Sequence, residues 1–246
     1  MIRLFRVILL ACAGGFAMTA HSADGVLPIG GADDIGHPSE MVLRKIVLGD
    51  ATYAMPAAFF DPPNEAGERR PRDMLFQAWL PDMVPLTGKN YDALIGGSAS
   101  NQRVRILVQA SLPGDPAPLM GPLMSVYRGV INAPLGRGDA PAPEVTFEPG
   151  PDGSRRVRIP HEPTYPQGTP REVFIDGVPA SMNTILICWI YDVTRLPYPS
   201  CRMTFMHRQA TFTVTFNRSY LEEWRKVRSR TIALFERYKV TSGISE

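Results

Sequence analysis

The hydrophobic period changes from two residues to about 3.6 near position 218, and this change constrains the fold more than any other feature. In residues 210–217, Phe212, Val214 and Phe216 alternate with threonines, which is typical of a strand with one buried face. Beyond them, apolar or small side chains recur at intervals of three and four, at Tyr220, Trp224, Val227, Thr231, Leu234 and Tyr238. This spacing predicts an amphipathic helix over 220–238 that packs on a sheet, with a capping-box pattern at Ser219 and Glu222.

Strand patterns precede this helix along most of the chain. They cover residues 41–49, 51–60, 74–83, 102–110, 155–160, 171–177, 183–193, 201–207 and 210–217, the last two as a hairpin. Segment 183–193 is apolar on both faces and is therefore expected between two packed layers. Residues 123–131 fit either a short helix or an extended segment. The predicted class is α+β, a mainly antiparallel β-sheet with the C-terminal amphipathic helix packed on it.

Proline and glycine divide the sequence into parts. The chain holds 24 prolines and 21 glycines, and a dense cluster of them lies at 133–153. We expect a flexible segment at 24–40, an N-terminal β-rich half at 41–132, a Pro/Gly-rich connection at 133–154 and a C-terminal α+β half at 155–240.

The first 23 residues have the layout of a secretory signal peptide. Arg3 and Arg6 precede an uncharged apolar run, and Ala20-His21-Ser22 fits a cleavage site. This apolar run is too short to span a bilayer, which needs about 20 residues. The sequence therefore predicts export to the periplasm. Leu9-Leu10-Ala11-Cys12 also resembles a lipobox, so a lipoprotein anchored in the envelope through Cys12 is the less favoured alternative.

Charge argues against nucleic acid and anionic membrane as partners. Two of the 26 basic residues lie in the leader, so the rest of the chain has 24 basic and 24 acidic residues. A balanced chain of this kind lacks the basic footprint of a nucleic-acid-binding protein.

Cys188 and Cys201 remain as a pair once the leader is removed. Disulfides persist in an oxidising compartment, the spacing is not C-x-x-C, and ligands for a metal site are lacking. The midpoint between the cysteines falls between Thr194 and Arg195, so antiparallel pairing of the strands 183–193 and 200–207 would bring them opposite each other. We expect a disulfide there, holding a loop whose Arg195, Leu196 and Tyr198 are candidate partner-binding residues.

A search for catalytic and metal-binding patterns finds no convincing site. Histidines are few and lack ligand spacing, Ser98 lacks the second glycine of a nucleophile elbow, and the GRGD tetrapeptide at 136–139 fits a chance match in a loop. Other isolated candidates have no evident partner: Asp33, Asp34, His37, His161, Glu162 and His207. No catalytic residue, metal or cofactor is therefore predicted.

Several short segments together resemble a loose group of exported, often lipid-anchored proteins of Gram-negative bacteria, some of the antibacterial-toxin immunity type. The residues that carry the resemblance are Tyr53-Ala-Met-Pro56, Trp79-Leu-Pro-Asp-Met83 with Pro85, Thr87 and Asn90, the strand 102–110, Cys188, Cys201-Arg-x-x-Phe205 and Leu221-x-x-Trp224. The resemblance implies a non-enzymatic periplasmic binding protein, an immunity protein that neutralises a secreted toxin. An envelope-localised hydrolase and a structural or assembly module of the envelope are the alternatives.

Overall fold

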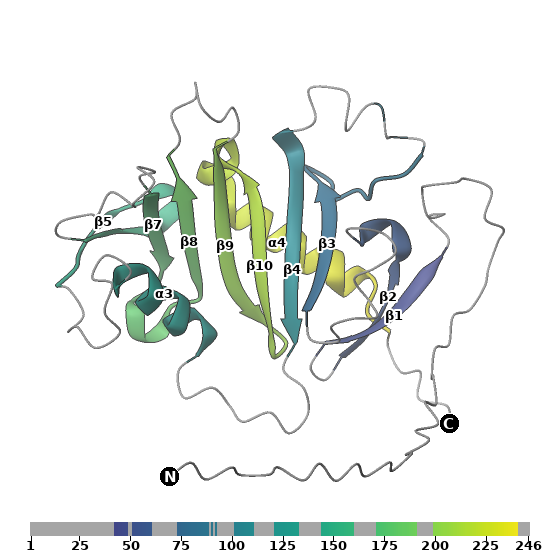
Figure 1. The fold of residues 1–246 in the computed structure, drawn as a ribbon, viewed down its shortest axis with the longest axis horizontal. Helices are drawn as coiled ribbons and strands as arrows, with labels where there is room; N and C mark the ends of the chain where they lie inside the picture. The colour runs from purple at the N-terminus through teal and green to yellow at the C-terminus, as the bar shows by residue number, and fades with distance from the viewer. Residues whose placement is uncertain are drawn as a thin grey trace, which may run out of the picture.

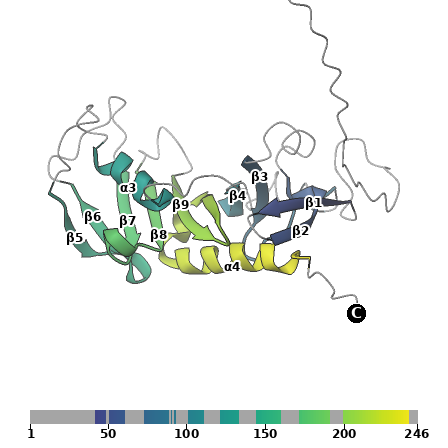
Figure 2. The same ribbon diagram turned by 90° about the horizontal axis from the view of Figure 1, so that it is seen from below.

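A computed structural model describes residues 42–48, 51–60, 73–88, 90, 92, 101–110, 121–132, 144–159, 171–190 and 199–240. Within these ranges, eight strands form one antiparallel sheet in the order β3-β4-β10-β9-β8-β7-β6-β5, and β1 and β2 form a separate hairpin. One helix lies on each face of the large sheet, α4 on one side and α3 on the other (Figures 1 and 2).

The strands are β1 (Leu43–Leu48), β2 (Ala51–Pro56), β3 (Asp73–Trp79), β4 (Arg103–Ala110), β5 (Thr146–Pro149), β6 (Arg155–Arg158), β7 (Arg171–Asp176), β8 (Thr184–Trp189), β9 (Ser200–His207) and β10 (Ala210–Asn217). Alternation of apolar and polar residues is clearest in β4 and β10, whereas β7 and β8 are buried almost throughout. The helices are α3 (Pro122–Asn132) and α4 (Trp224–Arg237), with 3-10 turns η1 (Ala57–Phe59), η4 (Pro151–Gly153), η5 (Pro179–Ser181) and η6 (Arg218–Glu223).

The larger hydrophobic core lies between α4 and the sheet. Helix α4 buries one stripe, Trp224, Val227, Thr231, Leu234 and Phe235. This stripe meets the inward residues of β10, Phe212, Val214 and Phe216, and those of β3, β4 and β9. The predicted helix stripe and the predicted alternation in 210–217 are both confirmed.

The smaller core lies on the other face, beneath α3. The sequence left residues 123–131 open, and they form a helix that begins at Pro122, a residue tolerated in a first turn because its missing N–H is not needed there. Leu123, Tyr127 and Val130 pack on Ile185 and Ile187 of β8. Because Leu186 and Cys188 of the same strand join the α4 core, β8 is buried on both faces, as its apolar sequence predicts.

The β1–β2 hairpin is attached to the end of α4. The backbone N–H of Ala54 donates to the carbonyl of Tyr238 at 2.8 Å, and the N–H of Val240 donates to Thr52 at 2.8 Å. Tyr53 packs edge-on against Phe235, with ring centroids 6.1 Å apart. The hairpin therefore shares the α4 core although it lies outside the large sheet.

The start of the C-terminal helix differs from the prediction. Residues 218–223 form the 3-10 turn η6, and regular α-helix begins at Trp224. The side-chain oxygen of Asn217 accepts a hydrogen bond from the N–H of Ser219 at 2.9 Å, so Asn217 caps this turn. The predicted capping box at Ser219 is therefore wrong, because Asn is an equally good cap and lies two residues earlier.

Part of the segment 133–154 is regular structure. Residues 146–149 form the edge strand β5, and 151–153 form η4, with Asp152 and Gly153 at positive φ angles of 49° and 72°. The indole N–H of Trp224 donates to the carbonyl of Pro151 at 3.1 Å. Strands from both expected halves join in the one large sheet.

Candidate functional site

The structure contains the disulfide that the sequence leads one to expect. Cys188 of β8 and Cys201 of β9 are directly opposite each other in the antiparallel pair, and their Sγ atoms are 2.04 Å apart. Both side chains are fully buried on the α4 side of the sheet. The bond joins the end of β8 to the beginning of β9.

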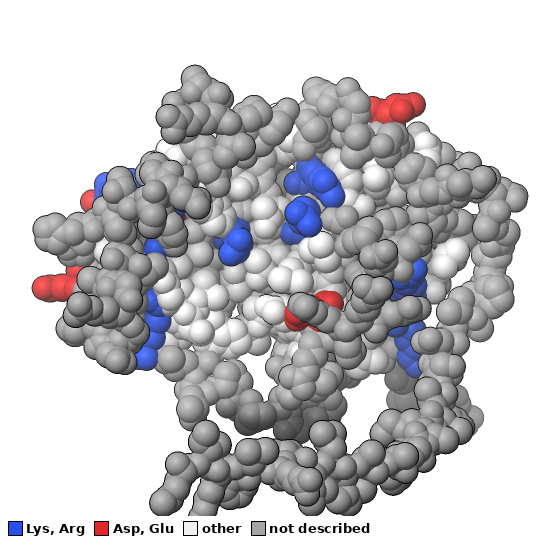
Figure 3. Space-filling view, in the orientation of Figure 1, with Lys and Arg blue, Asp and Glu red and all other residues white. Residues whose placement is uncertain are grey.

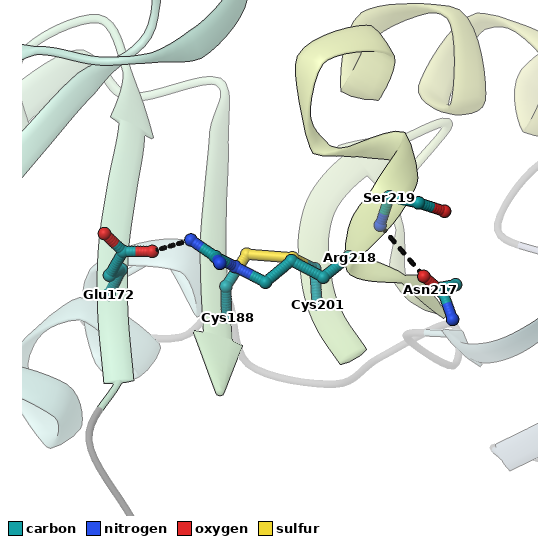
Figure 4. The surroundings of a disulfide bond; sticks show 6 residues. All are labelled: Glu172, Cys188, Cys201, Asn217, Arg218 and Ser219. Atoms are coloured by element: carbon teal, nitrogen blue, oxygen red, sulfur yellow. Dashed lines mark hydrogen bonds and ion pairs between the residues drawn. A yellow bond between two sulfur atoms is a disulfide. The ribbon is translucent and has the colours of Figure 1, made fainter. Parts of the chain in front are cut away.

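A charged cluster lies over this disulfide. The side chain of Arg218 extends from η6 past the two sulfur atoms and donates a hydrogen bond to the carboxylate of Glu172 on β7 (Figure 4). Arg156 of β6 forms a second ion pair with Glu172 at 3.0 Å. These groups line an open cavity of about 400 Å³, with Glu222 at its edge. The cluster links β6, β7 and η6, so its geometry is that of a structural clamp.

A second cluster holds the first turn of α4 against the sheet. Arg225 donates to both carboxylate oxygens of Asp176, at 2.7 and 3.2 Å, and its Nε–H donates to the carbonyl of Asp152 at 2.7 Å. Arg228 lies 3.8 Å from the same Asp176 carboxylate. Burial lowers the pKa of Arg228 from its usual value, and the nearby carboxylate of Asp176 opposes that effect. The arginines thus serve the packing of α4.

His207 is the one histidine candidate from the sequence that falls within the described ranges, and it lies on the α4 side of the sheet. Its Nε2 is 2.9 Å from Oε1 of Glu236, and Arg208 donates to both carboxylate oxygens of Glu236, at 2.6 and 3.1 Å. These contacts tie the β9–β10 turn to the last turn of α4. The other isolated candidates, Asp33, Asp34, His37, Ser98, His161 and Glu162, lie outside the described residues.

The contacts at Glu236 predict a pH-dependent contribution to stability. Hydrogen bonds from Arg208 and His207 lower the pKa of Glu236 from 4.5 to about 2. A carboxylate with a lowered folded-state pKa stabilises the fold above its unfolded pKa, and this contribution is lost as the pH falls from about 4.5 to about 2. Because Glu236 is about one-third exposed, water weakens the pairing, and we expect about 1 kcal/mol at neutral pH.

The measurement is the difference in unfolding free energy between the unchanged protein and Glu236→Gln across that pH range. We expect the difference to shrink towards zero in acid. Glu222→Gln removes one negative charge from an exposed position and serves as the control. A difference that stays constant down to pH 2 would contradict the assignment.

The predicted partner-binding residues Arg195, Leu196 and Tyr198 lie outside the described ranges, in the interval 191–198. The structure does describe both ends of this interval. The disulfide holds Cys188 and Cys201 with their Cα atoms 4.0 Å apart, so the chain leaves and re-enters the sheet at neighbouring points.

The sequence did not single out the face of the sheet opposite α4, and the part of this face formed by β9, β10 and β4 is a second candidate surface. Most of its side chains are exposed or half-buried, and Thr204 is buried. Between α3 and β3, the strands β9, β10 and β4 direct one set of side chains away from α4, and we call these side chains the open strip: Ser200, Arg202, Thr204, Met206, Thr211, Thr213, Thr215, Asn217, Arg103, Arg105, Leu107 and Gln109. Figure 3 shows basic side chains gathered over β9 and β4 on this face, with largely uncharged surface around them.

Aromatic rings brace two arginines of the open strip. The guanidinium carbon of Arg202 lies 5.0 Å from the ring centroid of Trp189, and that of Arg103 lies 5.9 Å from the ring centroid of Trp79. Arg103 also donates to the side-chain oxygen of Gln77 at 2.9 Å. The alternation in 102–110 places Arg103 and Arg105 on one face, but only the sheet order brings Arg202 beside them.

Two further observations concern metals and membranes. No three His, Cys, Asp or Glu side chains within the described ranges come together as a metal site would require. No helix in that part of the chain has both the length and the apolar character needed to cross a membrane.

The fold is similar to that of solved bacterial proteins. No protein-family model and no curated protein matches the sequence. Smlt3025, an immunity protein of the Stenotrophomonas maltophilia type IV secretion system, superposes with a TM-score of 0.55 over 85% of this chain and 100% of that chain, at 11% identity. The iron-regulated outer membrane lipoprotein FrpD of Neisseria meningitidis gives a TM-score of 0.47 over 84% of this chain and 97% of that chain, at 8% identity. At 11% identity, the likeness to the immunity protein is one of fold alone.

Proposed function

We propose that this chain is a non-enzymatic immunity protein that is exported to the periplasm, where it binds and neutralises a secreted antibacterial toxin. The observation that carries the proposal is the similarity of fold to Smlt3025, which extends over the whole of that immunity protein and most of this chain. The resemblance of the short sequence segments to exported immunity-type proteins points in the same direction without depending on the structure.

Export is supported by the cysteine chemistry. A fully buried disulfide between adjacent strands is a feature of proteins from oxidising compartments such as the bacterial periplasm. The first 23 residues have the pattern of a leader that would direct the chain there. Processing at Cys12 would anchor the protein to the envelope by lipid and would leave the binding function unchanged.

Toxin binding is proposed to involve the segment between the two cysteines. Tyrosine and arginine are enriched at the centres of protein interfaces, and this segment offers Arg195, Leu196 and Tyr198. The disulfide fixes both ends of the segment, which lowers the conformational entropy lost when it binds.

The test uses the product of the gene next to the one that encodes this chain. That product is directed to the periplasm of a susceptible strain, with and without this protein, and growth is measured. We expect growth to be restored, and the purified proteins to form a complex of fixed stoichiometry. Inhibition that needs one copy of this protein per toxin molecule indicates binding, whereas an enzyme would act at a much lower ratio. If the neighbouring product is not toxic, or is toxic and does not bind, the proposal is overturned.

The loop is tested by replacing Arg195, Leu196 and Tyr198 together with alanine. If the loop is at the centre of the interface, this variant should bind at least about 30-fold more weakly, which corresponds to about 2 kcal/mol, the scale of an interface hot spot. Replacement of exposed Val47 by alanine on β1 is the control for loss of apolar surface elsewhere. Binding that is unchanged by the triple replacement would remove the loop from the interface while leaving the immunity function in place.

A further inference from the structure

We propose that the open cavity over the disulfide is a binding site for a small zwitterion with an apolar body, which is the chemistry of a free apolar amino acid. The cavity is formed by β6, β7, η6 and the turn between β5 and β6. All of its described walls are well placed in the fold without any partner, and the site does not depend on the proposed contact with a toxin.

The cavity has the size and the charge balance of a site for a small neutral molecule. Its volume of about 400 Å³ lies in the range of about 300 to 1,000 Å³ that is typical of small-molecule pockets. Two positive and two negative side chains line it, Arg156, Arg218, Glu172 and Glu222. Because these charges balance, the lining favours an occupant that has no net charge and carries one group of each sign.

Glu172 is shared between the two arginines in a way that leaves hydrogen-bond donors unused. Its Oε1 lies 3.0 Å from Nη2 of Arg156, and its Oε2 accepts a hydrogen bond from Nη2 of Arg218 (Figure 4). A guanidinium group can bind both oxygens of one carboxylate through two parallel N–H bonds, and neither arginine does so with Glu172. The Nε atoms of Arg156 and Arg218 are buried and have no hydrogen-bond partner among the described residues.

These two Nε–H groups are the observation that points to a carboxylate ligand. A buried donor without an acceptor costs free energy, and such groups are rare in folded proteins. The side chains of Arg156 and Arg218 are 25% and 32% exposed, so both guanidinium groups can turn towards the cavity. A carboxylate bound there would accept the second N–H bond that Glu172 leaves unmade on each arginine.

Glu222 provides the partner for an ammonium group. It lies at the edge of the cavity, its side chain is exposed, and it forms no ion pair within the described part of the chain. The adjacent Glu223, in contrast, pairs with Lys226 at 2.9 Å. An α-amino acid carries its carboxylate and its ammonium group on one carbon atom. These two groups can therefore meet Arg218 and Glu222, which belong to the same short turn η6.

The wall behind the charged groups is apolar. Phe174 and Leu221 line the cavity and are only 3% and 6% exposed, and residues 149–151 complete the lining. A Cβ atom on Gly150 would lie 2.9 Å from Cδ1 of Phe174, so the glycine allows this turn to pack closely on the ring. The apolar body of a ligand would rest on this wall and be removed from water, which favours binding.

A simple anion or a simple cation suits the cavity less well. Phosphate or a carboxylate without an ammonium group would pair with Arg156 and Arg218, but Glu222 would repel it. An amine without a carboxylate would pair with Glu222 and be repelled by both arginines. A zwitterion is favoured because it meets each group of the lining with the opposite charge.

The experiment adds four small molecules, one at a time, to protein expressed from its full coding sequence. Phenylalanine has both charged groups and an apolar body, phenylacetate lacks the ammonium group, phenethylamine lacks the carboxylate, and serine lacks the apolar body. NMR follows the backbone signals of β6, β7 and η6 and the Nε–H signals of Arg156 and Arg218. We expect phenylalanine to shift these signals and to bind at least about tenfold more tightly than the other three molecules.

Substitutions separate a binding role of the charged groups from a structural one. Glu222→Gln should weaken phenylalanine binding by about tenfold and should leave phenylacetate unchanged or tighter, because both the partner of the ammonium group and the repulsion of the anion are lost. Glu223→Gln is the matched control, since it removes the same charge from the next residue and should leave both affinities unchanged. Arg218→Lys keeps the positive charge and removes the Nε–H group, and it should weaken phenylalanine and phenylacetate alike.

Thermal unfolding of each variant shows whether it is folded, and Glu222→Gln, at an exposed position, retains the test if Arg218→Lys does not fold. A loss of preference for phenylalanine over phenylacetate in Glu222→Gln supports the site, because a purely structural cluster would not change it. The proposal is overturned if phenylalanine does not bind, if it shifts signals elsewhere, or if another of the four molecules binds as tightly. It is also overturned if folded Glu222→Gln or folded Arg218→Lys binds phenylalanine as the unchanged protein does. None of these outcomes bears on the immunity function, since no toxin takes part.

Discussion

Phe235→Ala is expected to lower the free energy of unfolding by about 3 to 5 kcal/mol, the scale of a large-to-small change in a closed core. Phe235 is fully buried, and its ring stands edge-on to the rings of Tyr53, Phe76 and Phe212, with centroids 6.1, 5.2 and 5.0 Å away. One side chain of α4 therefore joins the β1–β2 hairpin, the edge strand β3 and the central strand β10. Equilibrium unfolding in urea measures the change.

Two matched variants show whether the aromatic contacts matter. Phe235→Leu keeps most of the side-chain volume, so the change in packing should lower the free energy of unfolding by less than about 1.5 kcal/mol. The loss of the edge-on ring contacts adds to this cost. Ile232→Ala removes a half-buried side chain of the same helix and should cost less than Phe235→Ala. If Phe235→Ala costs no more than Ile232→Ala, the ring is not the link between the three elements.

The sequence was most informative where one periodicity runs through a whole element. The alternation of Phe212, Val214 and Phe216 and the stripe from Trp224 to Leu234 predicted both the strand and the helix face that meet in the core. The α+β class followed from these patterns together. The start of α4 was missed because a 3-10 turn and an α-helix share their first side-chain spacings, and because Asn217 and Ser219 are both good caps.

Sheet order was beyond the reach of periodicity. Strand β10 pairs with its hairpin partner β9 and with β4, which is distant in the sequence. No local sequence pattern predicts the pairing of β10 with β4. The sequence predicts a Pro/Gly-rich connection where strand β5 lies, because the four residues of β5 include Pro149 and alternate weakly. An edge strand tolerates proline, since one side of its backbone has no partner strand.

Of the two candidate sites, the disulfide could be predicted from the sequence and the open strip could not. Cys188 and Cys201 were predictable because they are the only cysteines outside the predicted leader, and the structure places them directly opposite each other in neighbouring strands. The open strip was not, because Arg202 and Arg105 are almost 100 residues apart and meet only through the shared neighbour Thr215. A charge that looks solitary in the sequence becomes part of a surface once strand order is known.

Loss of the disulfide is expected to cost about 3 kcal/mol of stability. The bond closes a segment with a sequence separation of 13, and the chain-entropy model assigns about that value to a loop of this length. Both sulfur atoms are buried beneath the Arg218–Glu172 pair, so reduction should need unfolding and should be slow in the native protein (Figure 4). Urea unfolding of the unchanged protein with and without reductant measures the difference.

The variant Cys188→Ala with Cys201→Ala separates the cross-link from the packing of the sulfur atoms. It should be destabilised by at least as much as the reduced protein, since two buried sulfur atoms are lost as well as the bond. Reductant should leave its unfolding curve unchanged, because no cross-link remains within the sheet.

Alkylation tests the disulfide in the unchanged protein. When this protein is denatured without reductant, Cys188 and Cys201 should resist alkylation, and after reduction they should accept two labels. Labelling of both thiols without reductant would contradict the disulfide, and the fixed ends proposed for the segment 191–198 would be lost with it.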